Sequence, residues 1–219
     1  MTPRGLLAEE MNKIRQELAL MAARVEMDLG KALAVLHSGG ASLAKEVKAS
    51  GIIVDALQIK IEDMVLVLIA TQQPVARDLR ELVTVFKITG NLERIGDHGI
   101  HLAKAAVKLS DRPSFRSIRR IESMAETGQE MLKTAISAYL AHDAGAARKT
   151  AALDEKIDRE HKALTEEVLA LMKEKPQLIK AAARLLKLSG FMERLGDHIT
   201  NICEGIIFMT EGCYEELNE

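Results

Sequence analysis

The sequence has few of the residues that mark disulfide-rich or nucleic-acid-binding proteins. It contains no tryptophan, 3% aromatic residues and two cysteines. Cys203 and Cys213 are not spaced as a CxxC pair and form no cysteine-rich framework, which favours a reduced, cytoplasmic setting. The scarcity of aromatic rings leaves few platforms on which bases could stack. Because 30 Lys and Arg are balanced by 32 Asp and Glu, bulk charge does not favour binding to nucleic acid or to an acidic membrane.

Long apolar runs and strand patterns are missing as well. The longest apolar runs, such as Met64–Ala70, fall far short of the roughly 20 residues that span a bilayer. The N-terminus lacks the apolar core of a signal peptide, and no stretch has the period-2 alternation of a β-strand. The sequence therefore predicts a soluble, all-α protein that reaches a membrane only indirectly, through partners.

Apolar residues recur every three or four positions along most of the chain, which predicts six long helices. We expect them at about residues 6–37, 41–72, 74–109, 115–142, 143–175 and 176–210. Gly39 and Gly40 end the first helix, and Pro74 separates the second from the third. The segment 110–114, Ser-Asp-Arg-Pro-Ser, is the best candidate for a link between two halves, which we place at residues 1–110 and 115–219.

The two halves are copies of each other. Residues 93–98, Glu-Arg-Ile-Gly-Asp-His, return as residues 193–198, Glu-Arg-Leu-Gly-Asp-His. Further upstream, residues 32–51 align without a gap with residues 135–154, at an offset of 103. The duplication therefore predicts two tandem repeats of three helices each.

In each copy an acid is followed four residues later by an aspartate, which places both carboxylates on one face of a helix. Asp55 lies 19 residues before Pro74 and Glu93 lies 19 residues after it, so in an antiparallel hairpin they share a level. In the second half Asp158 lies 18 residues before Pro176, and Glu193 lies 17 after it. We therefore expect three acids to converge in the first half and four in the second. The first set is Asp55, Glu93 and Asp97, and the second is Asp154, Asp158, Glu193 and Asp197.

Clustered carboxylates in a partly buried groove repel one another and need a positive partner, or one must hold a proton. A metal ion is our preferred interpretation: Mg²⁺, Mn²⁺ or Ca²⁺, or iron or zinc if His98 or His198 turns inward. The alternative is a solvated face on which the acids pair with basic neighbours, namely Arg94, Arg194, Lys87 and Lys187. Gly96 and Gly196, inside their helices, suggest the close approach of another helix, or only a shared origin.

The same residues resemble the PhoU family. The resemblance is carried by Gln-Pro-Val-Ala-Arg-Asp-Leu-Arg at 73–80, Asn-Leu-Glu-Arg-Ile-Gly-Asp at 91–97 and Glu-Arg-Leu-Gly-Asp at 193–197, and it covers essentially the whole chain. It implies two three-helix bundles with pseudo-two-fold symmetry. It also implies multinuclear metal sites, most often of iron or zinc, with magnesium and manganese possible, at the acids named above. Where the family often has a further acid, the second copy has Asp154 but the first has Gly51, so the first site is expected to bind fewer metals or bind them more weakly.

For function, the resemblance implies a cytoplasmic accessory regulator of phosphate uptake that restrains the phosphate-starvation response. Its implied partners are the ATPase subunit of the phosphate ABC transporter and a sensor histidine kinase, and a homodimer is consistent with the family. The protein is not expected to be an enzyme. A carboxylate-bridged dimetal oxidase or hydrolase is the alternative, but the Glu-x-x-His spacing of ferritin-like sites is absent, since Gly96 and Gly196 stand where histidine would. A metal-free helical adaptor is a third reading.

Overall fold

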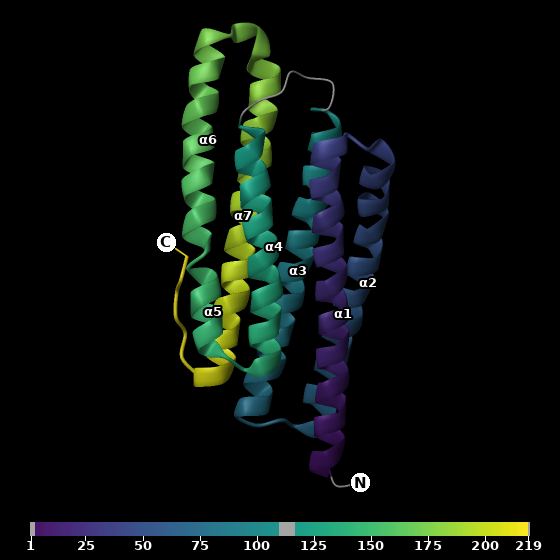
Figure 1. Cartoon of the computed structure of the whole chain (residues 1–219). Helices are drawn as coiled ribbons and strands as arrows, with labels where there is room; N and C mark the ends of the chain where they lie inside the picture. The colour runs from purple at the N-terminus through teal and green to yellow at the C-terminus, as the bar shows by residue number, and fades with distance from the viewer. Residues whose placement is uncertain (1–2, 110–116, 219) are drawn as a thin grey trace.

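The computed structural model describes residues 3–109 and 117–218, and every regular element in these two ranges is helical. The elements are α1 (Pro3–Ser38), α2 (Ala41–Gln72), α3 (Arg77–Val107), α4 (Ile118–Ala141), α5 (Ala144–Ala151), α6 (Asp154–Glu174), a 3₁₀ turn (Pro176–Leu178) and α7 (Ile179–Glu211) (Figure 1). The predicted all-α class is confirmed. The proposed link at 110–114 lies outside the described residues.

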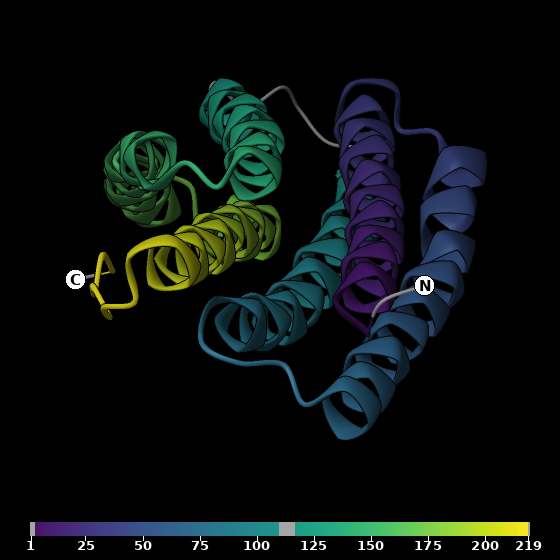
Figure 2. The ribbon, with the colours of Figure 1, turned by 90° about the horizontal axis from the view of Figure 1, so that it is seen from below.

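The helices form two bundles that lie next to each other. Figure 2 shows α1, α2 and α3 on one side and α4, α5, α6 and α7 on the other. The most extensive helix contact joins α3 to α7, the two helices that carry the repeated motif, and α1 also packs against α4. Apolar side chains at helical spacing form the core, with Leu82, Ile88, Leu185 and Leu188 fully buried. The apolar stripe that leads to Glu93 is only partly buried, because Leu79 and Phe86 are 38% and 41% exposed. The two-repeat, six-helix plan is therefore confirmed, with the fifth helix interrupted.

That interruption was not predicted. We expected one helix over residues 143–175, but the α-helical hydrogen-bond pattern is interrupted at Ala152 and Leu153, whose backbone angles stay right-handed helical, and it resumes at Asp154. The amide of Leu153 donates to the carbonyl of Thr150 at 3.1 Å, a 3₁₀-type bond that tightens the chain. No proline or glycine marks this break. Its effect is to place Asp154 in the first turn of α6, where the positive end of a helix dipole stabilises a carboxylate.

The two hairpin turns also differ from prediction by a few residues. Helix α3 begins at Arg77 rather than Pro74, because Gln73 and Ala76 have positive φ angles of 46° and 45° that no helix can contain. In the second half the chain makes the 3₁₀ turn at Pro176–Leu178 before α7 begins. Helix α2 ends at Gln72 as expected and α6 ends one residue early at Glu174, so the difference lies mainly in the helix that follows each turn.

The centre of the α3–α7 contact is marked by the histidines of the two motifs. The rings of His98 and His198 stack with centroids 5.5 Å apart. Because these residues occupy equivalent positions in the two repeats, the pseudo-two-fold axis passes between them. Equivalent features of the repeats therefore lie at opposite ends of the α3–α7 contact.

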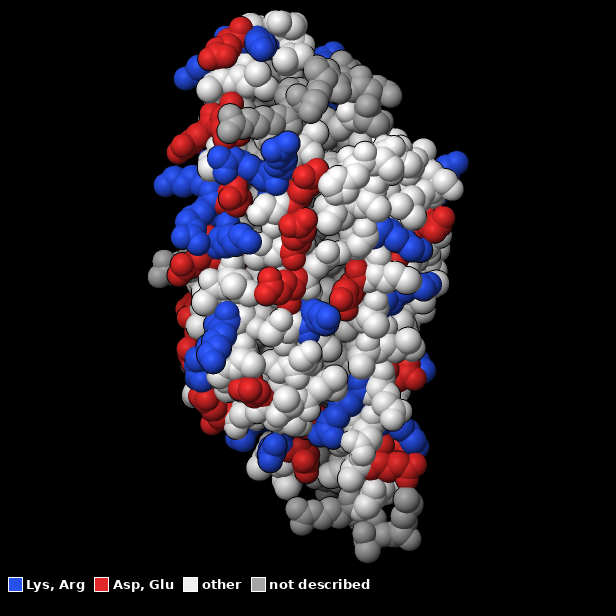
Figure 3. All heavy atoms as spheres, in the orientation of Figure 1, with Lys and Arg blue, Asp and Glu red and all other residues white. Residues whose placement is uncertain are grey.

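Charge is mixed on the surface. On the face shown in Figure 3, acidic and basic side chains are interspersed and no single sign dominates. No helix in the described ranges is long and apolar enough to cross a membrane.

Candidate functional site

The first acidic cluster consists of Asp55 from α2 and of Glu93 and Asp97 from α3. Asp55 is exposed, whereas Glu93 and Asp97 are half-buried. Burial raises the pKa of Glu93 above its ordinary value, and the charges of Asp97 and Asp55 raise it further, while Arg94 lowers it. The three carboxylates therefore lie within electrostatic reach of each other, at the level that counting from the turn predicts.

The second acidic cluster consists of Asp154 and Asp158 from α6 and of Glu193 and Asp197 from α7. Burial raises the pKa of Asp154 to about 7, and the charge of Asp158 contributes next. The pKa of Asp197 is raised as well, first by burial and then by the charges of Glu193 and Asp158. Asp154 is only 8% exposed, which is why burial is the main cause of its raised pKa.

Asp154 carries an oxygen whose hydrogen-bonding capacity is unused. Its Oδ2 accepts a hydrogen bond from the hydroxyl of Thr200 at 3.2 Å, but its buried Oδ1 has no partner among the described residues. A pocket of about 320 Å³ borders this carboxylate, and Asp158, Asp197 and Arg148 also line it. An unpaired buried carboxylate oxygen beside a pocket is a place where a cation fits, because the cation would supply the missing partner.

The side chains do not form a finished coordination cage. Within the described chain, no group of three or more His, Cys, Asp or Glu side chains is arranged closely enough to hold one metal ion as it stands. Asp158 is exposed and Asp197 half-buried, so both have room to rotate toward Asp154. The metal-ligand role of the seven acids stays a prediction that the residue types and the second cluster fit.

The two motif glycines have different surroundings. A Cβ atom at Gly196 would collide with Oδ1 of Asp154, so glycine is what lets this carboxylate lie against α7. A Cβ atom at Gly96 would lie 3.7 Å from Val54, an ordinary contact. The close approach that the sequence suggests is therefore real at Gly196, and is made by a carboxylate. At Gly96 a methyl group would fit.

The first cluster lacks the fourth acid for a structural reason. Gly51 takes the place that Asp154 has in the second repeat, and Ile100 takes the place of Thr200. A Cβ atom at Gly51 would lie 2.7 Å from Cδ1 of Ile100. The carboxylate and its hydroxyl donor are thus replaced together by a glycine and an apolar side chain that fills the space.

The alternative, an acidic face neutralised by basic neighbours, accounts for one acid. In the described part of the chain, the only ion pair between the seven acids and a Lys or Arg joins Arg94 to Glu93 at 3.3 Å. Lys87 instead lies 5.1 Å from the ring centre of Tyr214, and Lys187 lies 5.6 Å from that of Phe191. The other six acids form no ion pair with a Lys or Arg of the described residues, although the charge of Arg194 partly offsets the raised pKa of Asp197.

The family model for the PhoU domain matches the chain twice, over residues 18–106 and 121–206. The chain belongs to the PhoU family. The resemblance noted in the sequence is thereby confirmed, with one PhoU domain in each repeat.

Relatives match over nearly their full length. The phosphate-specific transport system accessory protein PhoU homolog of Clostridium acetobutylicum is 30% identical over 217 residues, covering 99% of each chain. Its namesake in Caulobacter vibrioides is 35% identical over 210 residues, covering 95% of this chain and 90% of that one. The crystal structure of PhoU from Pseudomonas aeruginosa superposes with a TM-score of 0.90 at 28% identity, covering 94% of this chain and 99% of that one. These relatives are named as accessory proteins and not as enzymes.

Some residues around the second acidic cluster were missed by the sequence reasoning, although the PhoU motif lies beside them. Thr200 lies one turn after Asp197. In the aligned repeats Ile100 stands at the position of Thr200 and Gly51 at that of Asp154, and this paired difference could have pointed to Thr200 as a neighbour of the carboxylate. Arg148 was missed as well. It binds Glu211 and Glu215 at 2.7 and 2.6 Å and so holds the C-terminal segment against α5, beside the pocket.

The motif histidines do not join the acids. Burial lowers the pKa of His98 to about 4, with His198 and Arg194 contributing next, so the ring is neutral near pH 7. Burial also lowers the pKa of His198, whose Nδ1 lies 3.0 Å from Oδ1 of Asn91. Both rings belong to the α3–α7 interface of the PhoU repeats.

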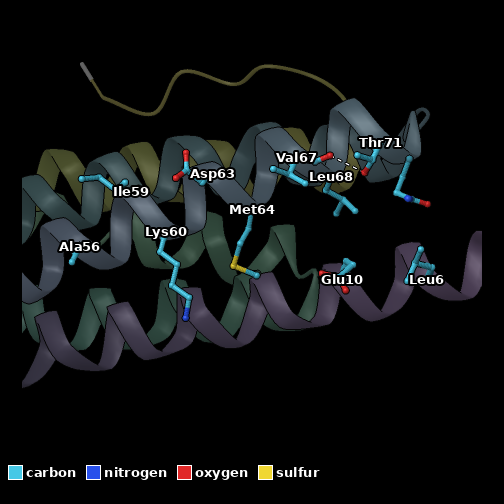
Figure 4. Close-up of a pocket in the computed structure, with 11 residues that line it drawn as sticks. Leu6, Glu10, Ala56, Ile59, Lys60, Asp63, Met64, Val67, Leu68 and Thr71 are labelled. Carbon is cyan, nitrogen blue, oxygen red and sulfur yellow. Dashed lines mark hydrogen bonds between the residues drawn. The ribbon is translucent and has the colours of Figure 1, made fainter.

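A larger pocket lies between α1 and α2, away from both clusters. This groove of about 720 Å³ is lined mainly by apolar side chains such as Leu6, Ile59, Met64 and Val67 (Figure 4). None of the seven predicted metal-binding acids borders it. Its composition excludes it as the acidic site of this PhoU protein.

Proposed function

We propose that this chain is an accessory regulator of phosphate uptake that restrains the phosphate-starvation response from the cytoplasm. The observation that carries the proposal is the match of both repeats to the PhoU domain, together with full-length relatives named as accessory proteins of the phosphate-specific transport system. A solved neighbour from Streptococcus pneumoniae, with a TM-score of 0.90, is likewise named a phosphate transport system regulatory protein.

The regulation would operate through binding rather than chemistry. The partners that the family suggests are the ATPase subunit of the phosphate ABC transporter and a sensor histidine kinase, with the chain acting as a homodimer. The long, rigid helices suit such a role, because they present wide surfaces that keep their shape when a partner docks.

The acidic clusters would bind divalent or transition metal ions, with iron, zinc, manganese and magnesium as candidates. In the second cluster Asp154, Asp158, Glu193 and Asp197 would hold the ion, and in the first Asp55, Glu93 and Asp97. A bound cation would neutralise carboxylates that repel one another and would tie α6 to α7. The support is the unpaired Oδ1 of Asp154 and its raised pKa, both of which a cation would relieve.

Partner binding is tested by affinity capture from lysates of the native organism grown at high and low phosphate. The tagged full-length chain should retain the transporter ATPase or the sensor kinase, and the amount captured should change with phosphate supply. Capture of neither protein under both conditions would refute the regulatory proposal. Light scattering of the purified chain tests the homodimer in the same preparation.

Metal binding is tested by elemental analysis of freshly purified protein. Asp197→Ala should lower the bound metal more than the matched Asp97→Ala, because only the second cluster contains a fourth acid. Helical circular dichroism should stay nearly unchanged in both variants. Unchanged metal content in both variants would count against the sites.

The difference between the clusters can also be tested by gain of function. Introducing Gly51→Asp together with Ile100→Thr recreates in the first cluster the carboxylate and hydroxyl of the second. Metal bound at the first cluster should then rise toward that of the second. Gly51→Asp alone is the control, since the Ile100 side chain still obstructs the new carboxylate.

A further inference from the structure

A second kind of site lies at the upper end of the α3–α7 contact in Figure 1, where the end of α3 meets the start of α7. It is a pocket of about 250 Å³, here called the basic pocket. Its charged and aromatic lining consists of His101, Lys104 and Lys108 from α3 and Arg184, Lys187 and Phe191 from α7. Among the described residues that line it there is no carboxylate. Four cations therefore share a small space without a neutralising acid.

The cations of the basic pocket have no acidic partner among the described residues. In the described ranges, none of Lys104, Lys108, Arg184 and Lys187 forms an ion pair with an Asp or Glu. Arg120 on α4, by contrast, bridges to Glu160 and Glu167.

Two contacts shape the basic pocket. Nη1 of Arg184 donates to the backbone oxygen of Lys108 at 3.2 Å, which holds the guanidinium across the end of α3. The ring of His101 stacks on that of Phe191, with centroids 5.1 Å apart and planes inclined by 15°. Phe191 is 9% exposed, so one wall of the pocket is a fixed aromatic surface.

The duplicated fold provides an internal comparison. The equivalent place at the other end of the α3–α7 contact is a pocket of about 520 Å³. There Glu204 stands at the position of Lys104, Phe208 at that of Lys108 and Thr84 at that of Arg184. Because the same helix contact forms with an acid, an aromatic ring and a hydroxyl at these positions, helix packing does not require the basic residues. Lys187 has Lys87 as its equivalent, so the two places differ in charge at three of these four positions.

We propose that the basic pocket binds a small phosphate anion, either inorganic phosphate or the phosphoryl group of a small phosphorylated molecule. A guanidinium offers paired N–H donors that match phosphate oxygens, and lysines add charge around it. The volume is just below the usual range of small-molecule pockets, which suits an anion better than a bulky ligand. The pocket shares no residue with the acidic clusters, so this site does not depend on metal binding.

Titration calorimetry on the chelated full-length chain at low ionic strength tests the proposal, with inorganic phosphate, pyrophosphate and ATP as separate probes. Comparing the three probes distinguishes binding of a free anion from binding of a phosphoryl group carried on a larger molecule. At least one probe should bind once per chain, and sulfate should compete weakly. Chelation removes any metal that could recruit phosphate to the acidic clusters.

The variants are taken from the other repeat. Lys104→Glu and Arg184→Thr introduce the residues that stand at the equivalent positions, Glu204 and Thr84, and each should weaken binding by about tenfold or more. Lys45→Glu, an exposed site on α2, makes the same charge change outside the pocket and should have an effect below about twofold. Should Lys104→Glu unfold, Lys104→Gln removes the charge more mildly.

Three results would overturn the proposal. The first is that no phosphate probe binds at millimolar concentration. The second is that Lys45→Glu weakens binding as much as Lys104→Glu, which would indicate attraction without a site. The third is that sulfate competes as well as phosphate, which would indicate a site for any anion. None of these results bears on partner capture or on metal content.

Discussion

Replacing Asp154 by asparagine should stabilise the metal-free protein and weaken the metal-loaded one. Asp154 is 8% exposed, its Oδ1 lacks a described partner, and three further acids surround it. Asparagine has nearly the same shape but no charge, and it can still accept the hydrogen bond from Thr200. The substitution therefore removes the repulsion while keeping the packing.

The magnitude follows from the pKa. A rise from 3.8 to about 7 corresponds to an upper limit of about 4 kcal/mol lost from the free energy of unfolding when the group is ionised. Because the buried amide of asparagine loses some hydration, we expect a gain of about 1 to 3 kcal/mol. The folded state binds the proton more tightly than the unfolded state, so the loss in the wild type develops as pH rises from about 4 to about 7 and is complete above that.

The assay is urea unfolding followed by circular dichroism, in the presence of a chelator, at about pH 5 and about pH 8. The advantage of Asp154→Asn over the wild type should be larger at the higher pH. Comparing the two proteins cancels the opposite effect of His98, whose lowered pKa makes both lose stability as pH falls below about 6.5. The exposed Asp158→Asn is the control and should gain less.

The reasoning is refuted if Asp154→Asn is less stable than the wild type at the higher pH without metal, or if its advantage does not change with pH. With metal added, the wild type should become more stable than Asp154→Asn, because only the wild type keeps the buried carboxylate that would bind the cation. A variant that gains as much from metal as the wild type would show that Asp154 is not a ligand.

Other expected outcomes concern glycine and a buried ion pair. Gly196→Ala should destabilise the chain in thermal melts and reduce its stabilisation by metal, since its Cβ would displace a carboxylate, whereas Gly96→Ala should stabilise by up to about 1 kcal/mol. If the melting temperature moved in the same direction in Gly196→Ala and Gly96→Ala, the difference between the surroundings of these two glycines would be contradicted. Glu81→Ala should lower the free energy of unfolding by about 2 to 4 kcal/mol in urea titrations, because Glu81 is 2% exposed and accepts two bonds from Arg15 at 2.6 and 2.8 Å. Glu9→Ala removes the exposed ion pair with Lys13 and should change the free energy of unfolding by less than about 1 kcal/mol. Equal losses in Glu81→Ala and Glu9→Ala would refute the idea that burial makes the Glu81 pair important.

Much of the site could be predicted because helices have a fixed rise per residue. Counting from Pro74 placed Asp55 level with Glu93, and the structure brings their charges within reach of each other. The break before Asp154 could not be predicted in this way, since Ala152 and Leu153 carry no signal that ends a helix. The burial of Asp154 comes from its contact with Gly196 and Thr200 of α7, which spacing along one helix does not specify.

The sequence alone determined the duplication, the all-α class and the sets of acids, since each depends on periodicity within a helix or on identity between two segments. Only the tertiary structure decided which acid is buried and left without a described partner, that Ile100 occupies the space opposite Gly51, and that Lys104 and Arg184 line one pocket. The physical reason is that desolvation and charge pairing depend on neighbours distant in sequence. The packing of α3 on α7 fixes those neighbours, and no local pattern of residues specifies it.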